Sequence, residues 1–213
     1  MSIAYSIVIP TYNAPNLRLL LDELNVFFLN KGTYEIIIIN DGGLSLSLTE
    51  PVILLEFEKN RGKNYALFEG LKIAQGQRII TLDDDGQHPV LEIEKLISKE
   101  NHDVVVGQYQ SENGVQSVIK HWTEIVLFGK KKDIRFTPFK LFKRAILKLD
   151  SFNNRVPFVS VLLMESTKDI VGIEVQVNEL LNQKTRFSFV KKVRFYRSLV
   201  ASKNSFFRML MGF

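Results

Sequence analysis

The sequence contains no cysteine among its 213 residues. A chain without cysteine has no disulfide framework, no thiolate nucleophile and no zinc site built from cysteines. This absence is consistent with a reducing compartment, and we therefore expect a cytoplasmic protein.

The sequence also lacks any apolar run that approaches the roughly 20 residues needed to span a bilayer. Its first residues, MSIAYSIVIPTYN, have no basic stretch before their short apolar run, and that run ends at a proline. We interpret this start as a β-strand rather than as a signal peptide.

Acidic residues are missing from the end of the chain. Residues 186–213 contain seven lysines and arginines, interleaved with aromatic and aliphatic residues, and no Asp or Glu. This pattern is typical of an element that lies on an anionic membrane surface. A C-terminal helix packed on the rest of the protein and a nucleic-acid-binding tail are the alternatives. We therefore divide the chain into a domain at residues 1–185 and a basic aromatic segment at residues 186–213.

Hydrophobic residues make up 46% and charged residues 24% of the chain, as in globular proteins with a substantial core. Five short apolar runs bounded by Gly, Pro, Asn or Asp predict buried strands: Ala4–Pro10, Tyr34–Asn40, Val52–Glu58, Arg78–Leu82 and Asp103–Val106. Helical patterns lie between or after them, at Asn16–Leu29, Lys63–Ala74, Val90–Ser98 and Val115–Phe128, and a further β-like run covers Ile170–Val177. This alternation predicts an α/β fold, with a mostly parallel sheet covered by helices on both faces.

Polar and turn-forming residues follow each of the first four predicted strands. They are Pro10-Thr11-Tyr12-Asn13, Asn40-Asp41-Gly42-Gly43, Asn60-Arg61-Gly62-Lys63 and the run from Asp83 to Pro89. Ligands of open α/β sheets bind at the carboxyl ends of the strands, so these residues predict a binding site along one edge.

Three consecutive aspartates stand in the fourth of these segments. In an extended backbone Asp83 and Asp85 point the same way and Asp84 points elsewhere, so the outer two can converge on one cation. Oxygen ligands of this kind favour Mg²⁺ or Mn²⁺, which share phosphate oxygens with a substrate. The structural alternative is an Asp-rich turn that caps the following helix.

The motifs VIPTYN, EIIIINDGG, NRGKNYALFEGLKIAQGQRIITLDDDGQHP and DVVVGQY follow one another in this order. Their combination resembles the family 2 glycosyltransferases of the GT-A fold, and within them the polyprenyl-phosphate branch that includes dolichol-phosphate mannose synthases. The resemblance covers about Ile7 to Gly107. It implies an inverting, metal-assisted transfer of a sugar from a nucleotide-sugar to a polyprenyl-phosphate or saccharide acceptor in cell-surface glycan synthesis.

The resemblance also implies roles for particular residues. The nucleotide-sugar would contact Pro10, Tyr12, Asn13, Asp41, Asn60, Gly62, Asp83 and Asp84. Asp83 and Asp85 would bind the metal, and these two with Gln87 would form the catalytic centre. An anionic acceptor would meet His88, Lys140 or Arg144; the alternative for the two basic residues is a solvated helix face.

The sequence departs from the family pattern at three places. Ala14 replaces an acidic residue, Asn40 replaces the first of two aspartates, and Gly107-Gln108-Tyr109 replaces Gly-Ser-Arg. A catalytically silent relative that acts as a partner subunit is therefore one alternative. A nucleic-acid-binding module is another, but it is disfavoured because the acidic edge repels phosphates. The basic charge and the absence of a clear general base favour a phosphate acceptor, and with the basic tail they predict a peripheral protein on the inner face of the cell membrane.

Overall fold

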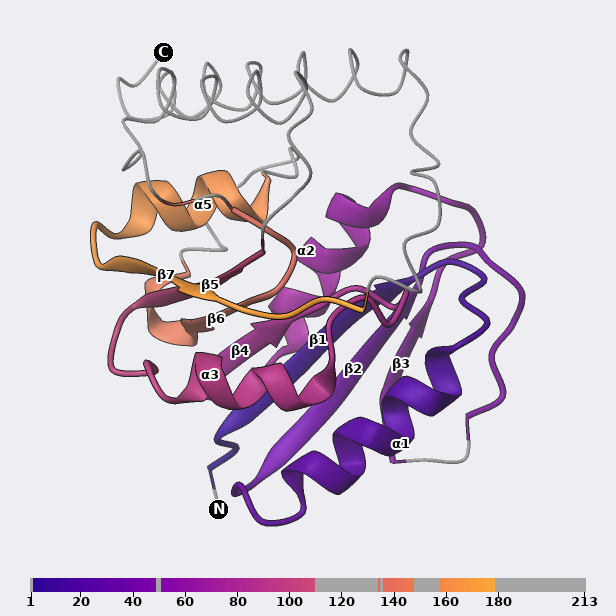
Figure 1. Cartoon of the computed structure of the whole chain (residues 1–213). Helices are drawn as coiled ribbons and strands as arrows, with labels where there is room; N and C mark the ends of the chain where they lie inside the picture. The colour runs from indigo at the N-terminus through magenta and orange to yellow at the C-terminus, as the bar shows by residue number, and fades with distance from the viewer. Residues whose placement is uncertain (1, 49–50, 110–133, 135, 148–157, 179–213) are drawn as a thin grey trace, which may run out of the picture.

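The protein is built around one seven-stranded sheet with the strand order β3-β2-β1-β4-β6-β5-β7. The computed structural model describes residues 2–48, 51–109, 134, 136–147 and 158–178 (Figure 1). The strands are β1 (Tyr5–Thr11), β2 (Tyr34–Asn40), β3 (Ile53–Glu56), β4 (Arg78–Thr81), β5 (Val104–Gln108), β6 (Lys140–Lys143) and β7 (Ile170–Glu174). All pairs are parallel except those that β6 makes with β4 and β5.

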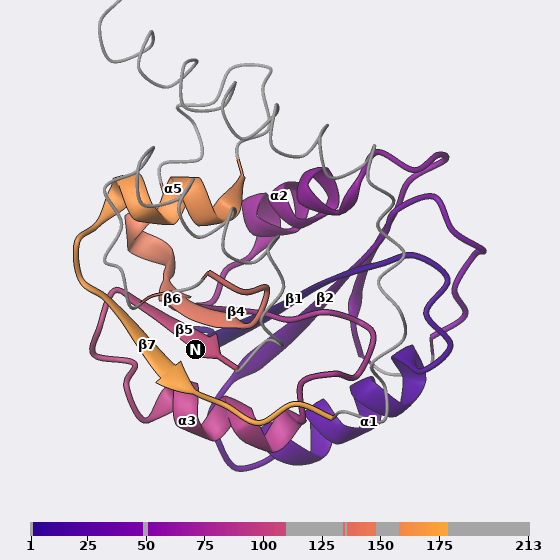
Figure 2. The same cartoon turned by 45° about the horizontal axis from the view of Figure 1, so that its top comes forward.

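Helices cover both faces of this sheet. They are α1 (Leu17–Phe28), α2 (Lys63–Ile73), α3 (Ile93–Ile97) and α5 (Val159–Ser166), with 3-10 turns η1 (Val90–Glu92) and η2 (Arg144–Ile146). Figure 2 shows α1 and α3 on one face and α2 and α5 on the other. The predicted α/β fold with a mostly parallel sheet is confirmed. None of the described helices combines the length and apolar character that a membrane crossing requires.

The central strand β1 explains why the strands are continuously apolar. Ile7 and Ile9 belong to the core under α1 and α3, whereas Val8 belongs to the core under α2 and α5. All three side chains are fully buried, because both faces of the strand are covered. On the α2 side, Gly70 allows close packing: a Cβ there would lie 2.6 Å from side-chain atoms of Val8 and Ile39.

Strand β6 differs from the sequence-based prediction. Lys140 and Arg144 were interpreted as acceptor-binding residues or as part of a solvated helix face. Lys140 lies instead in a strand between β4 and β5, so the helix alternative is wrong for it, whereas Arg144 is exposed and begins the 3-10 turn η2. Lys140 itself is 3% exposed. The strand pairs antiparallel with both neighbours; its residues 140–142 are buried and Lys143 is partly exposed. The predicted helix Val115–Phe128 and residues 186–213 lie outside the described residues.

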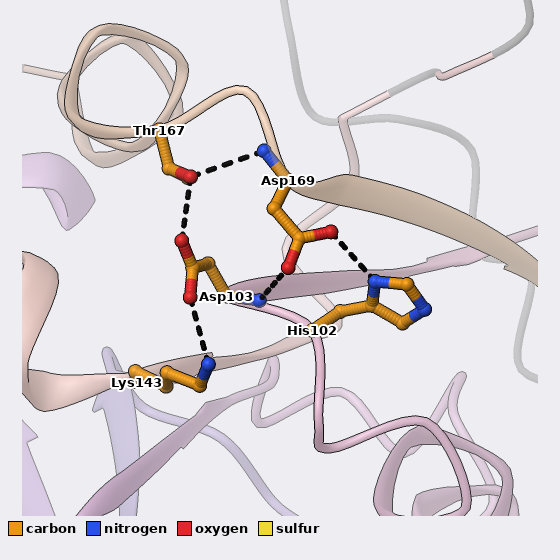
Figure 3. A network of polar contacts seen from close by, with 5 residues as sticks. All are labelled: His102, Asp103, Lys143, Thr167 and Asp169. Atoms are coloured by element: carbon orange, nitrogen blue, oxygen red, sulfur yellow. Dashed lines mark hydrogen bonds and ion pairs between the residues drawn. The ribbon is translucent and has the colours of Figure 1, made fainter.

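A polar network connects the beginnings of β5 and β7 with the end of β6 (Figure 3). Asp103 accepts hydrogen bonds from Lys143 Nζ at 2.8 Å and from Thr167 Oγ1 at 2.6 Å. Asp169 contacts His102 Nδ1 at 2.6 Å and accepts the backbone N–H of Asp103 at 3.0 Å. The Lys143 hydrogen bond lowers the pKa of Asp103, and the His102 contact lowers the pKa of Asp169. This network fixes the three strands at the end opposite the predicted site.

Candidate active site

The carboxyl ends of β1, β2 and β4 lie at one edge of the sheet, as predicted. In the parallel register Thr11 is beside Asn40, and Val8 is beside Thr81, the last residue of β4. Figure 1 shows the loops after these strands gathered at this edge, together with the beginning of α2. The fold therefore brings together the polar segments that are far apart in the sequence.

Asn40 organises the loop after β2. Its side-chain amide donates to the carbonyl of Leu44 at 2.8 Å and to Glu56 Oε1 at 2.9 Å, and its Oδ1 accepts the N–H of Gly43 at 3.0 Å. The contact with Asn40 lowers the pKa of Glu56. An aspartate has no donor for these acceptors. The pairing with Glu56 thus accounts for Asn40 where the family usually has Asp.

Asp41 connects the loop after β2 to the beginning of α2. It is 4% exposed, and its two carboxylate oxygens accept the backbone N–H groups of Arg61 at 2.7 Å and Gly62 at 2.9 Å. Gly62 has a φ of 97°, a conformation that favours glycine. The predicted donor-binding residue is therefore in place at the edge, but its carboxylate holds the Asn60–Gly62 turn.

The segment after β1 presents an open aromatic side chain. Pro10 is buried within the strand, whereas Tyr12 is 49% exposed. Asn13 has a φ of 54°, and its Oδ1 accepts the N–H of Leu44 at 2.7 Å. Ala14 is partly buried against the apolar core. Tyr12 is thus the residue of this segment best placed to meet a nucleotide.

The three aspartates lie in different surroundings. β4 ends at Thr81 and Asp84 and Asp85 lie in a turn, so the expected extended backbone is wrong. Asp84 nevertheless points away, because its carboxylate accepts the N–H of Tyr12 at 3.2 Å, and burial raises its pKa. Asp83 forms an ion pair with Lys63, and Asp85 accepts the N–H of Gln87 at 3.0 Å.

Asp83 and Asp85 act on the same neighbours. Burial lowers the pKa of His88, and the two carboxylates oppose that effect. Burial also raises the pKa of Tyr109, and the same two carboxylates raise it further. Both outer aspartates thus lie in the same loop, near His88 and Tyr109, and their convergence on one cation stays a prediction.

This donor set suits a hard divalent ion. Within the described ranges no three His, Asp or Glu side chains form a ready metal cage. Mg²⁺ is usually held by one or two carboxylates together with substrate phosphates and water. Two carboxylates at an edge open to a phosphorylated ligand match that requirement.

His88 supports the loop from inside. Its ring is 5% exposed and stacks on Phe139, with centroids 4.8 Å apart and an interplanar angle of 10°. The Tyr109 ring lies 5.4 Å away. No described residue provides a hydrogen-bond partner for its buried Nδ1. The ring therefore packs within the protein rather than projecting toward an acceptor.

The two basic acceptor candidates lie at opposite ends of β6. Lys140 is level with Thr81 and Val106, near the ends of β4 and β5 at the site edge. Arg144 follows the far end of the strand, where its N–H donates to the carbonyl of Gln77 at 2.9 Å. The antiparallel direction of β6 thus keeps Arg144 away from Asp83 and Asp85.

Lys63 was not singled out from the sequence as a site residue. It is the first residue of α2, and its ammonium group pairs with Asp83. The sequence feature that could have indicated Lys63 as a site residue is its position in the polar segment after the third predicted strand.

The profile of the family described as "Glycosyl transferase family 2" matches residues 6–170. The chain belongs to this family. An uncharacterized glycosyltransferase of Synechocystis is 32% identical over 167 residues, which cover 69% of this chain and 52% of the relative. An undecaprenyl-phosphate 4-deoxy-4-formamido-L-arabinose transferase of Yersinia enterocolitica is 36% identical over 114 residues, 47% of this chain and 35% of the relative. This chain thus spans about half or less of the length of these relatives.

Solved structures share the fold. Glucosyl-3-phosphoglycerate synthase from Mycobacterium tuberculosis in complex with UDP superposes with a TM-score of 0.70 at 16% identity, covering 95% of this chain and 79% of that chain. The same enzyme with Mn²⁺, UDP and glucosyl-3-phosphoglycerate gives a TM-score of 0.69 at 15% identity, with the same coverage of the two chains. At this identity the likeness establishes the GT-A architecture.

Proposed function

We propose that this family 2 glycosyltransferase moves a sugar from a nucleotide-sugar to a polyprenyl-phosphate acceptor. The observation that carries the proposal is the position of Asp83 and Asp85 in one loop directly after β4, at the carboxyl edge of the sheet. Membership of the family supports the transferase class, and the Yersinia relative, named for undecaprenyl phosphate, supports a lipid-phosphate acceptor. Related folds bind UDP with Mn²⁺, which supports a nucleotide donor and a divalent ion.

The donor would lie along the edge from β1 to β4. Tyr12 offers an exposed ring to the base, while Asn13 and Asp41 hold the backbone of the two loops beside it. The diphosphate would lie near Asp83 and Asp85. These two residues would hold Mg²⁺ or Mn²⁺, which neutralises negative charge on the departing nucleotide.

The reaction is a single displacement with inversion. A phosphate oxygen of the acceptor attacks the anomeric carbon as the bond to the nucleoside diphosphate breaks, and the bonding electron pair leaves with the diphosphate. A phosphate acceptor is already an anion, so no general base is needed. Two described lysines lie at this edge: Lys63 is exposed and pairs with Asp83, and Lys140 is buried at the site end of β6.

The test combines donor, acceptor and metal. Purified protein is incubated with Mn²⁺, a short-chain polyprenyl phosphate and UDP-, GDP-, CMP- or dTDP-sugars in turn, and the glycolipid is detected by mass spectrometry. One donor should give product, and EDTA or Asp85→Asn should abolish it. A protein that binds no nucleotide in the presence of Mn²⁺ would instead match the silent partner subunit suggested by Ala14.

A further inference from the structure

The chain after β7 leaves the sheet and contacts the loop that carries the aspartates. The N–H of Val175 still donates to the carbonyl of Gln108 at 2.8 Å, which continues the pairing with β5. The N–H of Gln176 donates instead to Glu92 Oε2 at 2.9 Å, and the N–H of Asn178 donates to the carbonyl of Gln87 at 2.8 Å. Within four residues the hydrogen bonds pass from the sheet to the aspartate loop.

Asn178 holds this loop with its side chain as well as its backbone. Its Nδ2 donates to the carbonyl of Gly86 at 3.1 Å, so two consecutive carbonyls of the loop are bound by one residue. Gly86 has a φ of 71°, and the turn at this point decides how Asp85 and Gln87 are directed. The two bonds from Asn178 therefore fix the Gly86–Gln87 and Gln87–His88 peptide planes, directly after Asp85.

Glu92 anchors the same segment beyond the loop. It is 9% exposed, accepts the N–H of Gln176 and pairs with Lys95 Nζ at 2.7 Å. A carboxylate that is buried and paired in this way has a fixed orientation. The crossing segment is thus held at Gln108 and at Glu92, with Asn178 projecting onto the loop.

We propose that Asn178 is a positioning residue that holds the Gly86–Gln87 backbone so that Asp83 and Asp85 keep the orientation needed for the diphosphate and its metal ion. This inference rests on the proposed function. Asn178 is exposed to solvent, so removing its amide opens no cavity in the core. Its contribution to the loop can therefore be separated from its contribution to folding.

The first measurement needs no ligand. Asn178→Ala removes the side-chain donor, and Asn178→Asp replaces it with a carboxylate that faces the carbonyl of Gly86. Hydrogen exchange of peptides covering residues 83–90 should become about fivefold faster in both variants, which corresponds to the loss of one hydrogen bond. Asn30→Ala, at an exposed asparagine outside the site, should leave this exchange unchanged.

The second measurement is the affinity for UDP, GDP, CDP or dTDP with Mn²⁺, whichever the wild type binds most tightly. Asn178→Ala should weaken that affinity about fivefold. Its melting temperature should equal that of the control variant Asn30→Ala. If both Asn178 variants show the hydrogen-exchange rates and the nucleotide affinity of the wild type, the positioning role is wrong. If the wild type binds no nucleoside diphosphate, the proposed function fails, and the exchange rates still decide whether Asn178 holds the loop.

Discussion

Asp83, Asp84 and Asp85 are identical in chemistry and differ in what surrounds them. Asp84 turns toward the N–H of Tyr12 and is shielded from solvent, which raises its pKa. Asp83 forms an ion pair with Lys63, and Asp85 accepts the N–H of Gln87. The different surroundings distinguish one carboxylate that connects two loops from the two that we propose bind the metal.

We expect Asp85→Asn to reduce Mn²⁺-dependent nucleotide binding by more than about tenfold, because the proposed metal ligand loses its charge. Asp84→Asn keeps an oxygen for the Tyr12 N–H, so its affinity should stay within about twofold of the wild type. Isothermal titration with and without Mn²⁺ measures both variants. Equal losses would show that the assignment of the outer aspartates to the metal is wrong.

The burial of His88 predicts how the stability of the protein depends on pH. Its folded-state pKa lies below 6.5, so the unfolded chain takes up a proton first as the pH falls through that value. Burying the neutral ring therefore costs stability below about pH 6.5, with a slope of at most about 1.4 kcal/mol per pH unit. His88→Phe keeps the stack on Phe139 and takes up no proton.

Urea unfolding of both proteins, from about pH 7.5 down to pH 5, gives the free energy of unfolding as a function of pH. The wild type should lose more stability than His88→Phe over this range. Parallel curves would mean that His88 has the same pKa in the folded and unfolded chains.

The loops after the strands support one another at the scale of elements. Asp41 holds the turn before α2 by two hydrogen bonds, and Asn13 and Asn40 hold the loop after β2. The loop after β2 approaches the segment before α2 closely at Gly42, where a Cβ would lie 2.3 Å from the backbone nitrogen of Asn60. The edge at which we propose that the donor binds is thus a set of loops that are hydrogen-bonded to each other.

Asp41→Ala should lower the free energy of unfolding by about 2 kcal/mol, since two backbone donors lose a charged partner. Nucleotide affinity should fall as well, because the Asn60–Gly62 turn is released. Asp22→Ala, at an exposed residue of α1, serves as the control and should be neutral in both respects. Thermal unfolding and nucleotide titration distinguish the two effects; a lower melting temperature with unchanged affinity would assign Asp41 to the turn alone.

The sequence predicted β1 to β5 because each is a continuous apolar run with a polar boundary. Asp41, Asp83 and Asp85 lie at the carboxyl edge of the sheet because they follow such runs, and their roles stay predictions. It did not predict β6, which has four residues, two of them lysines. It also gave no sign of Asn178, whose partner Gly86 lies 92 residues away along the chain. Long-range pairing of short polar segments leaves no periodic pattern to read.

At the scale of the whole molecule, the basic aromatic segment at residues 186–213 remains a prediction. We expect it to hold the protein on anionic membranes, since each Lys or Arg near such a surface contributes about 1 kcal/mol. The full chain should float with anionic liposomes and less so at high salt. Protein ending at Lys184 should remain at the bottom of the gradient. Equal flotation of the two proteins would remove the membrane role from the segment.

The position of β6 has a consequence for how the chain folds during synthesis. Strands β1 to β4 pair among themselves, so this half can assemble once residue 81 has emerged from the ribosome. Its edge at β4 stays unpaired until residues 140–143 arrive, roughly 60 residues later, and an unpaired strand edge invites association with other chains. We therefore expect the nascent protein to be most prone to aggregation before β6 pairs with β4.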